Sequence, residues 1–291
     1  MMKKILAVTL IAASVFSMCA CTKKDIVGAD AGETSEELKV ISTTLTEEQY
    51  GIGVDKDKPE LLAQVNAFLA ESRKSGELDE IIDRYLEGGE PKLVTSAELD
   101  KDKDQLVVVS TLDFEPFEYG EIGKYYGIDM EIIERLADYL DKELVIINSS
   151  FETMFLSVKQ HKCDICIGGI TITDERKQLV DFSEPYFITG LAIAVPVDNT
   201  EFDNVKNVTD MEMILKSKSE DETIGVENLT TAQAYCKGED GYEGLGMTVK
   251  GYRDLEAAII GLEDGECQYV LGDQVPVEMF VNRTNGKEQA R

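Results

Sequence analysis

The sequence predicts an α/β protein of two lobes, each of them a mostly parallel sheet covered by helices. Two observations support this: strands alternate with helices across residues 106–170, and the same alternation returns across residues 223–281. A length of 291 residues and an apolar fraction of 43% also suit a globular chain of roughly two domains.

The first region contains two successive β-α-β units, in which short apolar runs alternate with amphipathic stretches. Strands are expected at residues 106–110, 144–148 and 163–170, and helices at 128–140 and 151–160. Strands joined by helical crossovers pair in parallel, so a parallel sheet follows.

The second region repeats this order after an extended apolar segment at 185–195 and a connector at 198–207. Its expected strands are 223–226, 247–251 and 268–271, and its expected helices are 231–236, 255–262 and 275–281. Open α/β sheets bind ligands beyond the carboxyl ends of their strands. We therefore expect a site built from strand ends of both lobes.

The N-terminal residues 1–20 have the pattern of a secretory signal, with a basic start, an apolar run and a short end of small residues. The apolar run is too short for a membrane-spanning helix, which needs about 20 residues. Residues 21–37 form a polar tether with few apolar side chains. Beyond it the sequence predicts strands at 38–42 and 50–54.

Two helical patterns follow at residues 61–69 and 78–85, and residues 88–105 are expected to be a charged linker. Along the whole chain, 29 basic against 57 acidic residues give a net charge of −28, with the acidic excess spread out. Nucleic acid is not an expected partner, because binding a polyanion requires a basic surface.

Cysteine and histidine usage predicts neither a metal site nor a cofactor. Cys163 and Cys166 have C-x-x-C spacing, but they lie in an apolar strand and are expected to be small buried hydrophobes. Cys236 and Cys267 also replace apolar residues, and their pairing stays open. His161 is the only histidine and lies in a polar turn, which argues against a Ser-His-Asp triad or a histidine-based zinc site.

The stretch from Gly168 to Phe187 joins a glycine-rich strand end to the start of a helix. Thr173 is suited to cap that helix, whereas the cation of Arg176 in the first turn opposes the helix dipole. A bound anion, received by Arg176 and free backbone N–H groups, would remove this conflict. The alternative is that Arg176 pairs with Asp174 or Asp181 at the surface.

Asp273 directly follows an apolar run at the end of another predicted strand. Two roles fit a carboxylate in this position. It can face a ligand at the strand tip, or it can cap the helix that begins at Gln274.

Four segments of the chain have counterparts in one protein family: LDFEPFEY, GIDMEIIERLADYL, GGITITDERKQLVDFSEPYF and GLEDGECQYVLGDQVPVEMF. They resemble the extracytoplasmic solute-binding proteins of ABC importers for polar amino acids. With the N-terminal segment, the resemblance covers about residues 38–88 and 106–284. It implies a two-lobed fold of the periplasmic-binding-protein type, whose lobes close on an amino acid about two hinge strands.

The resemblance also implies the residues that hold the ligand. The α-carboxylate is assigned to the arginine of a T-x-T-x-x-R motif and to nearby hydroxyl groups, here Arg176, Thr171, Thr230 and Thr231. The α-amino group is assigned to Asp273 and the carbonyl group of Gly169. Leu229 departs from the family, which usually has glycine before the two threonines.

The side-chain pocket corresponds to Thr111, Phe114, Phe151 and Glu227. Relatives that bind basic or amide side chains often have an acidic residue at the position of Thr111, and Glu227 from the opposite lobe can supply a carboxylate instead. We therefore expect a polar ligand, neutral or cationic rather than acidic.

The order of the segments differs from the order in the family. The run at 38–85 corresponds to the family's last segment, yet here it precedes the others. The economical interpretation is a circular permutation in which the linker 88–105 joins the family's former termini. A fragment of a tandem protein is the alternative.

Permutation sets the expected boundaries of the two lobes. The first lobe covers 46–190, and the second covers 191–291 together with a strand at 38–43. The hinge is expected at the two crossings, near 42–48 and near 186–195.

Cys21, preceded by Ala20, resembles a lipobox, which implies cleavage before Cys21 and a lipid on its thiol. The implied protein is an extracytoplasmic monomer without enzymatic activity, anchored to the outer face of the bacterial cell membrane, that delivers an amino acid to an ABC permease. One alternative is a sensory lipoprotein that presents its ligand to a receptor. Another is a dehydratase on the same fold, with Glu115, Glu118 or Glu227 as acid or base.

Overall fold

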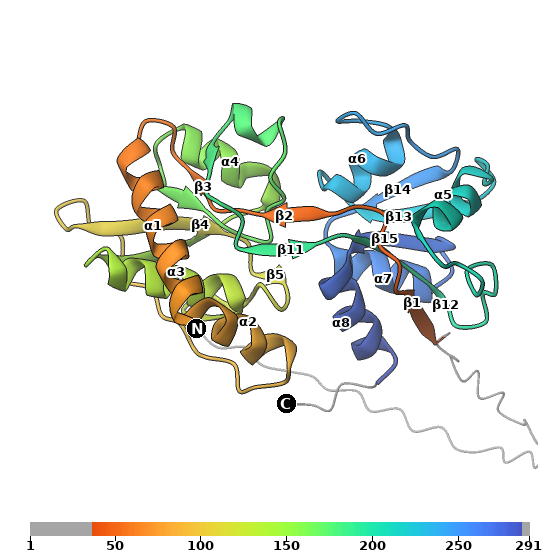
Figure 1. Cartoon of the computed structure of the whole chain (residues 1–291), viewed down its shortest axis with the longest axis horizontal. Helices are drawn as coiled ribbons and strands as arrows, with labels where there is room; N and C mark the ends of the chain where they lie inside the picture. The colour runs from red at the N-terminus through yellow and green to blue at the C-terminus, as the bar shows by residue number, and fades with distance from the viewer. Residues whose placement is uncertain (1–36, 287–291) are drawn as a thin grey trace, which may run out of the picture. The chain divides into compact units, whose positions relative to one another are not determined.

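The computed structural model describes residues 37–286 (Figure 1). The predicted signal segment, Cys21 and nearly all of the tether lie outside the described residues. Among the residues that are described, no helix has both the length and the apolar character needed to cross a membrane.

The first lobe is built on a five-stranded sheet whose parallel centre is β9-β4-β8, with β3 and β10 added antiparallel at one edge. In sheet order the strands are β10 (Asp181–Phe182), β3 (Gly53–Val54), β9 (Ile165–Cys166), β4 (Gln105–Ser110) and β8 (Glu143–Asn148). The predicted strands 106–110 and 144–148 are confirmed. The predicted strand 163–170 is regular only at Ile165 and Cys166, because the chain bends at Gly168 and Gly169, both of which have positive φ.

Helices cover both faces of this sheet. They are α1 (Pro59–Ser75), α2 (Glu77–Leu86), α3 (Ile128–Tyr139) and α4 (Phe151–Lys159). Successive strand residues point to opposite faces, so Val108 packs in the cluster of α1, α2 and α3, whereas Val109 packs in the cluster of α4. Gly76, with φ of 86°, ends α1 and lets α2 begin at once.

The second lobe contains the other five-stranded sheet, in which β13 pairs in parallel with β14 and β15, and β12 is antiparallel to β15 and β1. In sheet order the strands are β1 (Leu38–Ile41), β12 (Leu191–Pro196), β15 (Tyr269–Asp273), β13 (Thr223–Glu227) and β14 (Thr248–Tyr252). Its helices are α5 (Val208–Lys216), α6 (Thr231–Lys237), α7 (Leu255–Glu263) and α8 (Gln274–Thr284). Residues 198–207 form the predicted connector, but α5 was not predicted.

Two short strands connect the lobes. β2 (Glu48–Tyr50) and β11 (Phe187–Thr189) pair with each other and run between the two larger sheets (Figure 1). β11 lies within the crossing expected near 186–195, whereas β2 begins only at the last residue of the crossing expected near 42–48. A separate three-stranded sheet, β5 (Asp113–Phe114), β6 (Glu118–Glu121) and β7 (Lys124–Tyr126), leads from β4 to α3.

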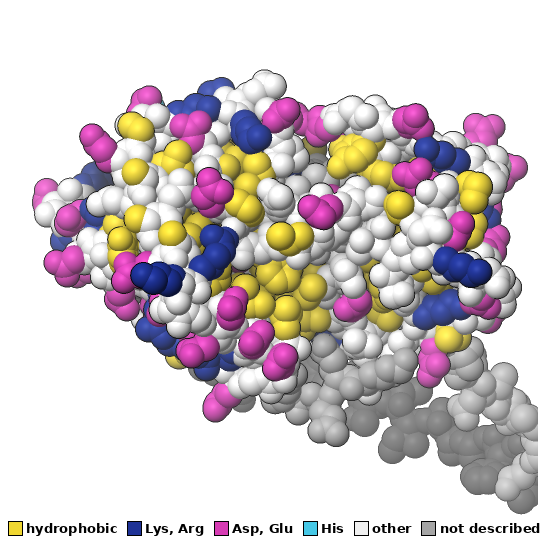
Figure 2. All heavy atoms as spheres, in the orientation of Figure 1, with side chains coloured by type: hydrophobic (Ala, Val, Ile, Leu, Met, Phe, Trp, Pro, Cys, Tyr) yellow, Lys and Arg dark blue, Asp and Glu magenta, His cyan; other side chains and the backbone are white. Residues whose placement is uncertain are grey.

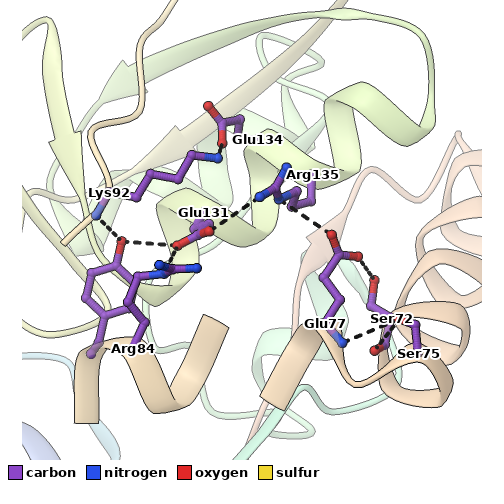
Figure 3. A network of polar contacts seen from close by, with 9 residues as sticks. Ser72, Ser75, Glu77, Arg84, Lys92, Glu131, Glu134 and Arg135 are labelled. Atoms are coloured by element: carbon purple, nitrogen blue, oxygen red, sulfur yellow. Dashed lines mark hydrogen bonds and ion pairs between the residues drawn. The ribbon is translucent and has the colours of Figure 1, made fainter. Parts of the chain in front are cut away.

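The N-terminal segment packs into both lobes. Strand β1 belongs to the sheet of the second lobe, as the permuted order requires, and its Leu38 exchanges hydrogen bonds of 2.9 and 2.8 Å with the side chain of Asn285, just beyond α8. In the first lobe, Arg84 of α2 donates to the fully buried carboxylate of Glu131 on α3, 3.1 Å away (Figure 3). This ion pair fixes α2 on the helix that follows the site-forming loop of β5 and β6.

The predicted linker 88–105 is packed rather than free. Val94 is completely buried and pairs with Tyr125 through two backbone hydrogen bonds, and Lys92 bonds Glu134 of α3 (Figure 3). Ser96 and Ala97 also form hydrogen bonds with the backbone of β8. The charged composition gave no sign of these contacts, because Val94 is the only large apolar side chain that the segment buries among the described residues.

Candidate functional site

The strand ends of the two lobes line one cavity. Its lining residues are Thr111, Asp113, Phe114, Glu118, Phe151, Gly168, Gly169, Thr171, Arg176, Glu227, Thr230, Thr231 and Asp273. Every ligand-holding residue predicted from the resemblance is among them. The cavity holds about 20 Å³, which is room for roughly one water molecule. A molecule of the size of an amino acid therefore does not fit into the cavity in this arrangement.

Arg176 lies at one end of the cavity with no carboxylate in ion-pair distance among the described residues. Its Nη1 donates to the carbonyl oxygen of Thr171 at 2.8 Å, and its guanidinium lies 5.0 Å from the ring centre of Phe151. Asp174 pairs with Lys177 instead. The surface-pair alternative for Arg176 is therefore wrong, and loss of hydration lowers the pKa of this unpaired cation.

The turn that carries Arg176 is shorter than predicted. The hydroxyl group of Thr173 accepts from the N–H group of Arg176 at 3.2 Å, but the N-cap residue is Glu175 rather than Thr173, and the helix is a single 3₁₀ turn, Arg176–Gln178. Asp181, the other partner considered for Arg176, pairs with Lys56 and continues into β10.

Asp273 lies in the same cavity and comes from the second lobe. Its Oδ1 is buried and has no hydrogen-bond partner among the described residues, and its side chain does not cap α8. Burial, and then the charge of Glu48, raise the pKa of Asp273 to about 8. A ligand cation at this position would favour its ionised form. Asp273 does occupy the N-cap position of α8, but its side chain makes no capping hydrogen bond.

The hydroxyl groups of Thr171 and Thr231 face a residue that the sequence reasoning missed. Both donate to the same oxygen of Glu48, at 2.5 and 2.9 Å. Glu48 lies on β2 and is 3% exposed. The sequence feature that could have identified Glu48 is its position two residues before Tyr50, which places both residues on the same buried face of a short strand.

Thr230 and Leu229 shape the loop that faces Arg176 from the second lobe. The hydroxyl group of Thr230 caps α6 by accepting from the N–H group of Gln233. Leu229 has φ of 65°, a left-handed conformation that glycine adopts without strain. The loop thus keeps a glycine-type backbone despite the departure in sequence, and the Leu229 carbonyl lies 3.4 Å from Arg176 Nη2.

The remaining wall of the cavity is acidic. Glu227 comes from the second lobe, and burial, followed by the charges of Asp113 and Asp273, raises its pKa to about 8. Glu118 is fully buried on the first lobe and accepts a hydrogen bond from Thr111 at 2.9 Å, while its second oxygen has no partner among the described residues. Asp113 and Glu118, which the sequence reasoning did not assign to the pocket, thus add two carboxyl groups to the cavity wall that contains Thr111.

Gly169 is held in place by a buried aspartate. Asp129 of α3 accepts from the N–H group of Gly169 and from the hydroxyl group of Tyr186, each at 2.9 Å. Gly169 has φ of 52°, and a Cβ atom there would lie 2.5 Å from the ring of Phe114. Only glycine lets the backbone approach the cavity so closely.

The sequence model of the bacterial extracellular solute-binding proteins, family 3, matches residues 106–277, which is more than half of the chain. The chain belongs to this family.

Known members and structures resemble this solute-binding protein over part of its length. An arginine-binding periplasmic protein of Mannheimia haemolytica is 32% identical over 174 residues, which cover 60% of this chain and 64% of that protein. The crystal structure of an arginine-, lysine- and histidine-binding protein from Geobacillus stearothermophilus is 31% identical, with a TM-score of 0.51 and coverage of 63% and 73%. This chain therefore spans less than two thirds of the curated arginine-binding protein that it matches.

One further solved structure is similar to this protein in fold alone. The crystal structure of an ancestral amino-acid-binding protein, a precursor of cyclohexadienyl dehydratase, is 23% identical, with a TM-score of 0.54 and coverage of 71% of this chain and 78% of the other. Of the acid or base candidates in this solute-binding protein, Glu118 and Glu227 line the cavity. Glu115 does not line it and pairs with Arg283.

Outside the cavity of this solute-binding protein, one group in the described part of the chain has the spacing of metal ligands: Asp55, Asp57 and His161. His161 Nδ1 lies 2.7 Å from the carboxylate of Asp55, which raises the pKa of the imidazole. The imidazole of His161 and the carboxylate of Asp55 are therefore hydrogen-bond partners of each other. The four described cysteines, Cys163, Cys166, Cys236 and Cys267, are free and buried, so Cys236 and Cys267 are not paired.

Proposed function

We propose that this solute-binding protein captures an amino acid with a cationic side chain between its lobes and delivers it to an ABC permease. The observation that carries the proposal is the charge arrangement of one cavity. Arg176, without an ion-pair partner among the described residues, faces it at one end, and the carboxyl group of Asp273 faces it with a buried oxygen that lacks a partner. Together they suit the carboxylate and ammonium groups of a zwitterion.

The acidic wall of the cavity narrows the expected ligand from a polar amino acid to one with a cationic side chain. Asp113, Glu118 and Glu227 gather beyond Asp273, and each carboxyl group has a pKa raised first by burial. A guanidinium or ammonium group in this wall would pair with them and restore their ionised form. A ligand carboxylate placed there would meet like charge, which disfavours glutamate and aspartate.

The magnitudes agree with a binding protein. Hydrogen bonds to charged groups contribute roughly 1.5–3 kcal/mol each, so several of them, less the cost of association, are compatible with about micromolar affinity. The net charge of −28 would also steer a cation toward the molecule. On the face in Figure 2, Lys and Arg side chains are interspersed with acidic ones rather than gathered in a basic patch.

Isothermal titration calorimetry with arginine, lysine, histidine, glutamine and glutamate tests the ligand class. Arginine or lysine is expected to bind most tightly, and Arg176→Ala is expected to abolish detectable binding. The matched control is Lys177→Ala, because the neighbouring Lys177 is 52% exposed and forms its ion pair with Asp174 at the surface. Glutamate as the tightest ligand, or equal binding by wild type and Arg176→Ala, would refute the proposal.

We propose further that the protein is a monomer held at the outer face of the cell membrane by lipid on Cys21. The family's extracellular location and the signal-like residues 1–20 support this. Metabolic labelling with a radioactive fatty acid should mark the wild type and not Cys21→Ser. Co-purification of a permease would support transport, whereas co-purification of a receptor would support sensing. Conversion of the bound amino acid on prolonged incubation would indicate an enzyme instead.

A further inference from the structure

Glu48 joins the two lobes from the strand that runs between them. Its Oε2 accepts from Thr171 of the first lobe at 2.5 Å and from Thr231, the first residue of α6 in the second lobe, at 2.9 Å. Its other oxygen accepts from Thr46 at 3.2 Å. The carboxylate is therefore the meeting point of hydroxyl groups from both lobes and from the hinge segment.

The charge of Glu48 is buried without a cation in ion-pair distance among the described residues, and it is only 3% exposed. Hydroxyl donors replace its hydration, which is how a buried carboxylate is tolerated. When the lobes separate, Thr171 and Thr231 cannot both remain in reach of one oxygen. Closure of the lobes without a ligand is therefore stabilised by the complete set of hydrogen bonds to Glu48.

Each threonine hydroxyl group has one proton to donate. In the structure both protons point to Glu48, so a ligand carboxylate cannot receive them while these bonds last. We propose that Glu48 is a positioning residue that latches the lobes in the absence of ligand, by holding the hydroxyl groups of Thr171 and Thr231. The inference rests on the proposed function only in taking lobe closure as the step that captures the ligand.

Hydrogen exchange of the ligand-free full chain, followed by mass spectrometry, tests the latch. Peptides that contain residues 168–176 and 228–233 report on the cleft, and peptides from β4 report on the buried core of the first lobe. Glu48→Ala is expected to speed exchange in the cleft roughly tenfold or more, the equivalent of a lost charge-assisted bond, and to leave β4 unchanged. Glu48→Gln, which keeps an acceptor oxygen, is expected to recover part of the protection.

The matched control is Glu47→Ala, since Glu47 neighbours Glu48 on the chain but is exposed. Unchanged cleft exchange in Glu48→Ala, or equal acceleration in Glu47→Ala, would overturn the proposal. If Glu48→Ala does not fold, Thr231→Val removes one donor at similar volume and should accelerate exchange in the same peptides. Because no ligand is present, failure of arginine to bind would refute the proposed function and leave this result unaffected.

Discussion

The guanidinium carbon of Arg176 lies 5.0 Å from the centre of the Phe151 ring, so the aromatic face positions the cation that we assign to the ligand carboxylate. A cation over an aromatic ring contributes about 0.5–1 kcal/mol at exposed sites and more when it is desolvated. Phe151→Leu keeps an apolar side chain and removes this contact. We expect it to weaken arginine binding about three- to tenfold in calorimetry.

The matched control for Phe151→Leu is Leu156→Ala, because Leu156 lies on the same helix, is 48% exposed and does not line the cavity. Equal affinities of wild type and Phe151→Leu would show that the ring does not position Arg176.

Asp273→Asn separates ligand binding from stability. The carboxyl group has a buried oxygen without a partner, and an amide of the same shape removes its charge. Binding should fall by at least about a hundredfold, because the ligand ammonium loses its counter-charge. The melting temperature of the ligand-free protein should not fall. Retained binding, or a marked loss of stability with binding intact, would contradict the assigned role.

Protons should leave the protein when the ligand binds near pH 7. Burial raises the pKa of both Asp273 and Glu227 to about 8, so the two groups are mostly protonated in the closed, ligand-free form. A ligand cation favours the carboxylate and lowers these pKa values. Calorimetry in buffers of different ionisation enthalpy should therefore show net proton release. Proton uptake, or no dependence on the buffer, would contradict this prediction.

The same two groups set the pH dependence of stability. Their pKa values are higher in the folded chain than in the unfolded chain, where they are about 4. Their contribution to the free energy of unfolding is therefore fully present below about pH 4, and it is lost as the pH rises through about 8. Between pH 6 and about 9, the melting temperature of ligand-free wild type should fall more steeply than that of an Asp273→Asn/Glu227→Gln double variant.

Leu229→Gly should stabilise the protein. Leu229 has φ of 65° and a side chain that is 53% exposed, so glycine removes backbone strain and little packing. A left-handed residue other than glycine costs about 1–2 kcal/mol, part of which is offset by the greater freedom of glycine in the unfolded chain. The denaturant midpoint should rise, whereas Leu156→Gly within α4 should lower it. A lower midpoint for Leu229→Gly would show that the side chain contributes more than the strain costs.

The circular permutation remains a proposal, and it predicts that the chain can be reordered. Asn285 bonds both backbone groups of Leu38, so the end of α8 lies beside the start of β1. A chain in which residues 89–286 come first and 38–88 follow through a short linker should therefore fold, because it keeps the packed segment around Val94. Circular dichroism and arginine binding equal to wild type are the expected results. A reordered chain that does not fold would contradict the permutation.

Much of the fold was predictable because its helices and strands are strongly periodic. The helix at 128–140 and the strand at 106–110 differ from the structure by one residue each, and Arg176 and Asp273 meet in one cavity as expected. The three-stranded sheet from β5 to β7 was missed, because strands of two to four residues have too little period to detect.

Glu48, Asp113 and Glu118 were not predicted as residues of the site for a different reason. A carboxylate in a sequence normally lies at the surface. Asp113 and Glu118 reach the cavity through the short strands that follow Thr111, whereas Glu48 meets the threonines of the cavity through a contact over a long sequence distance, the bond from Thr231. No local pattern encodes such a contact. Their role emerges only when the two lobes are seen together.

The pairing of β1 with β12 has a consequence for how the chain is made. Strand β1 leaves the ribosome before any of the first lobe, yet its partner is synthesised only after that lobe is complete. Helices α1 and α2 likewise cannot reach their final packing until α3 has been synthesised, because Glu131 of α3 is the ion-pair partner of Arg84. Neither lobe can close its core from a continuous early segment, so contacts distant in sequence delay folding. Such a delay is compatible with the extracellular location of the family.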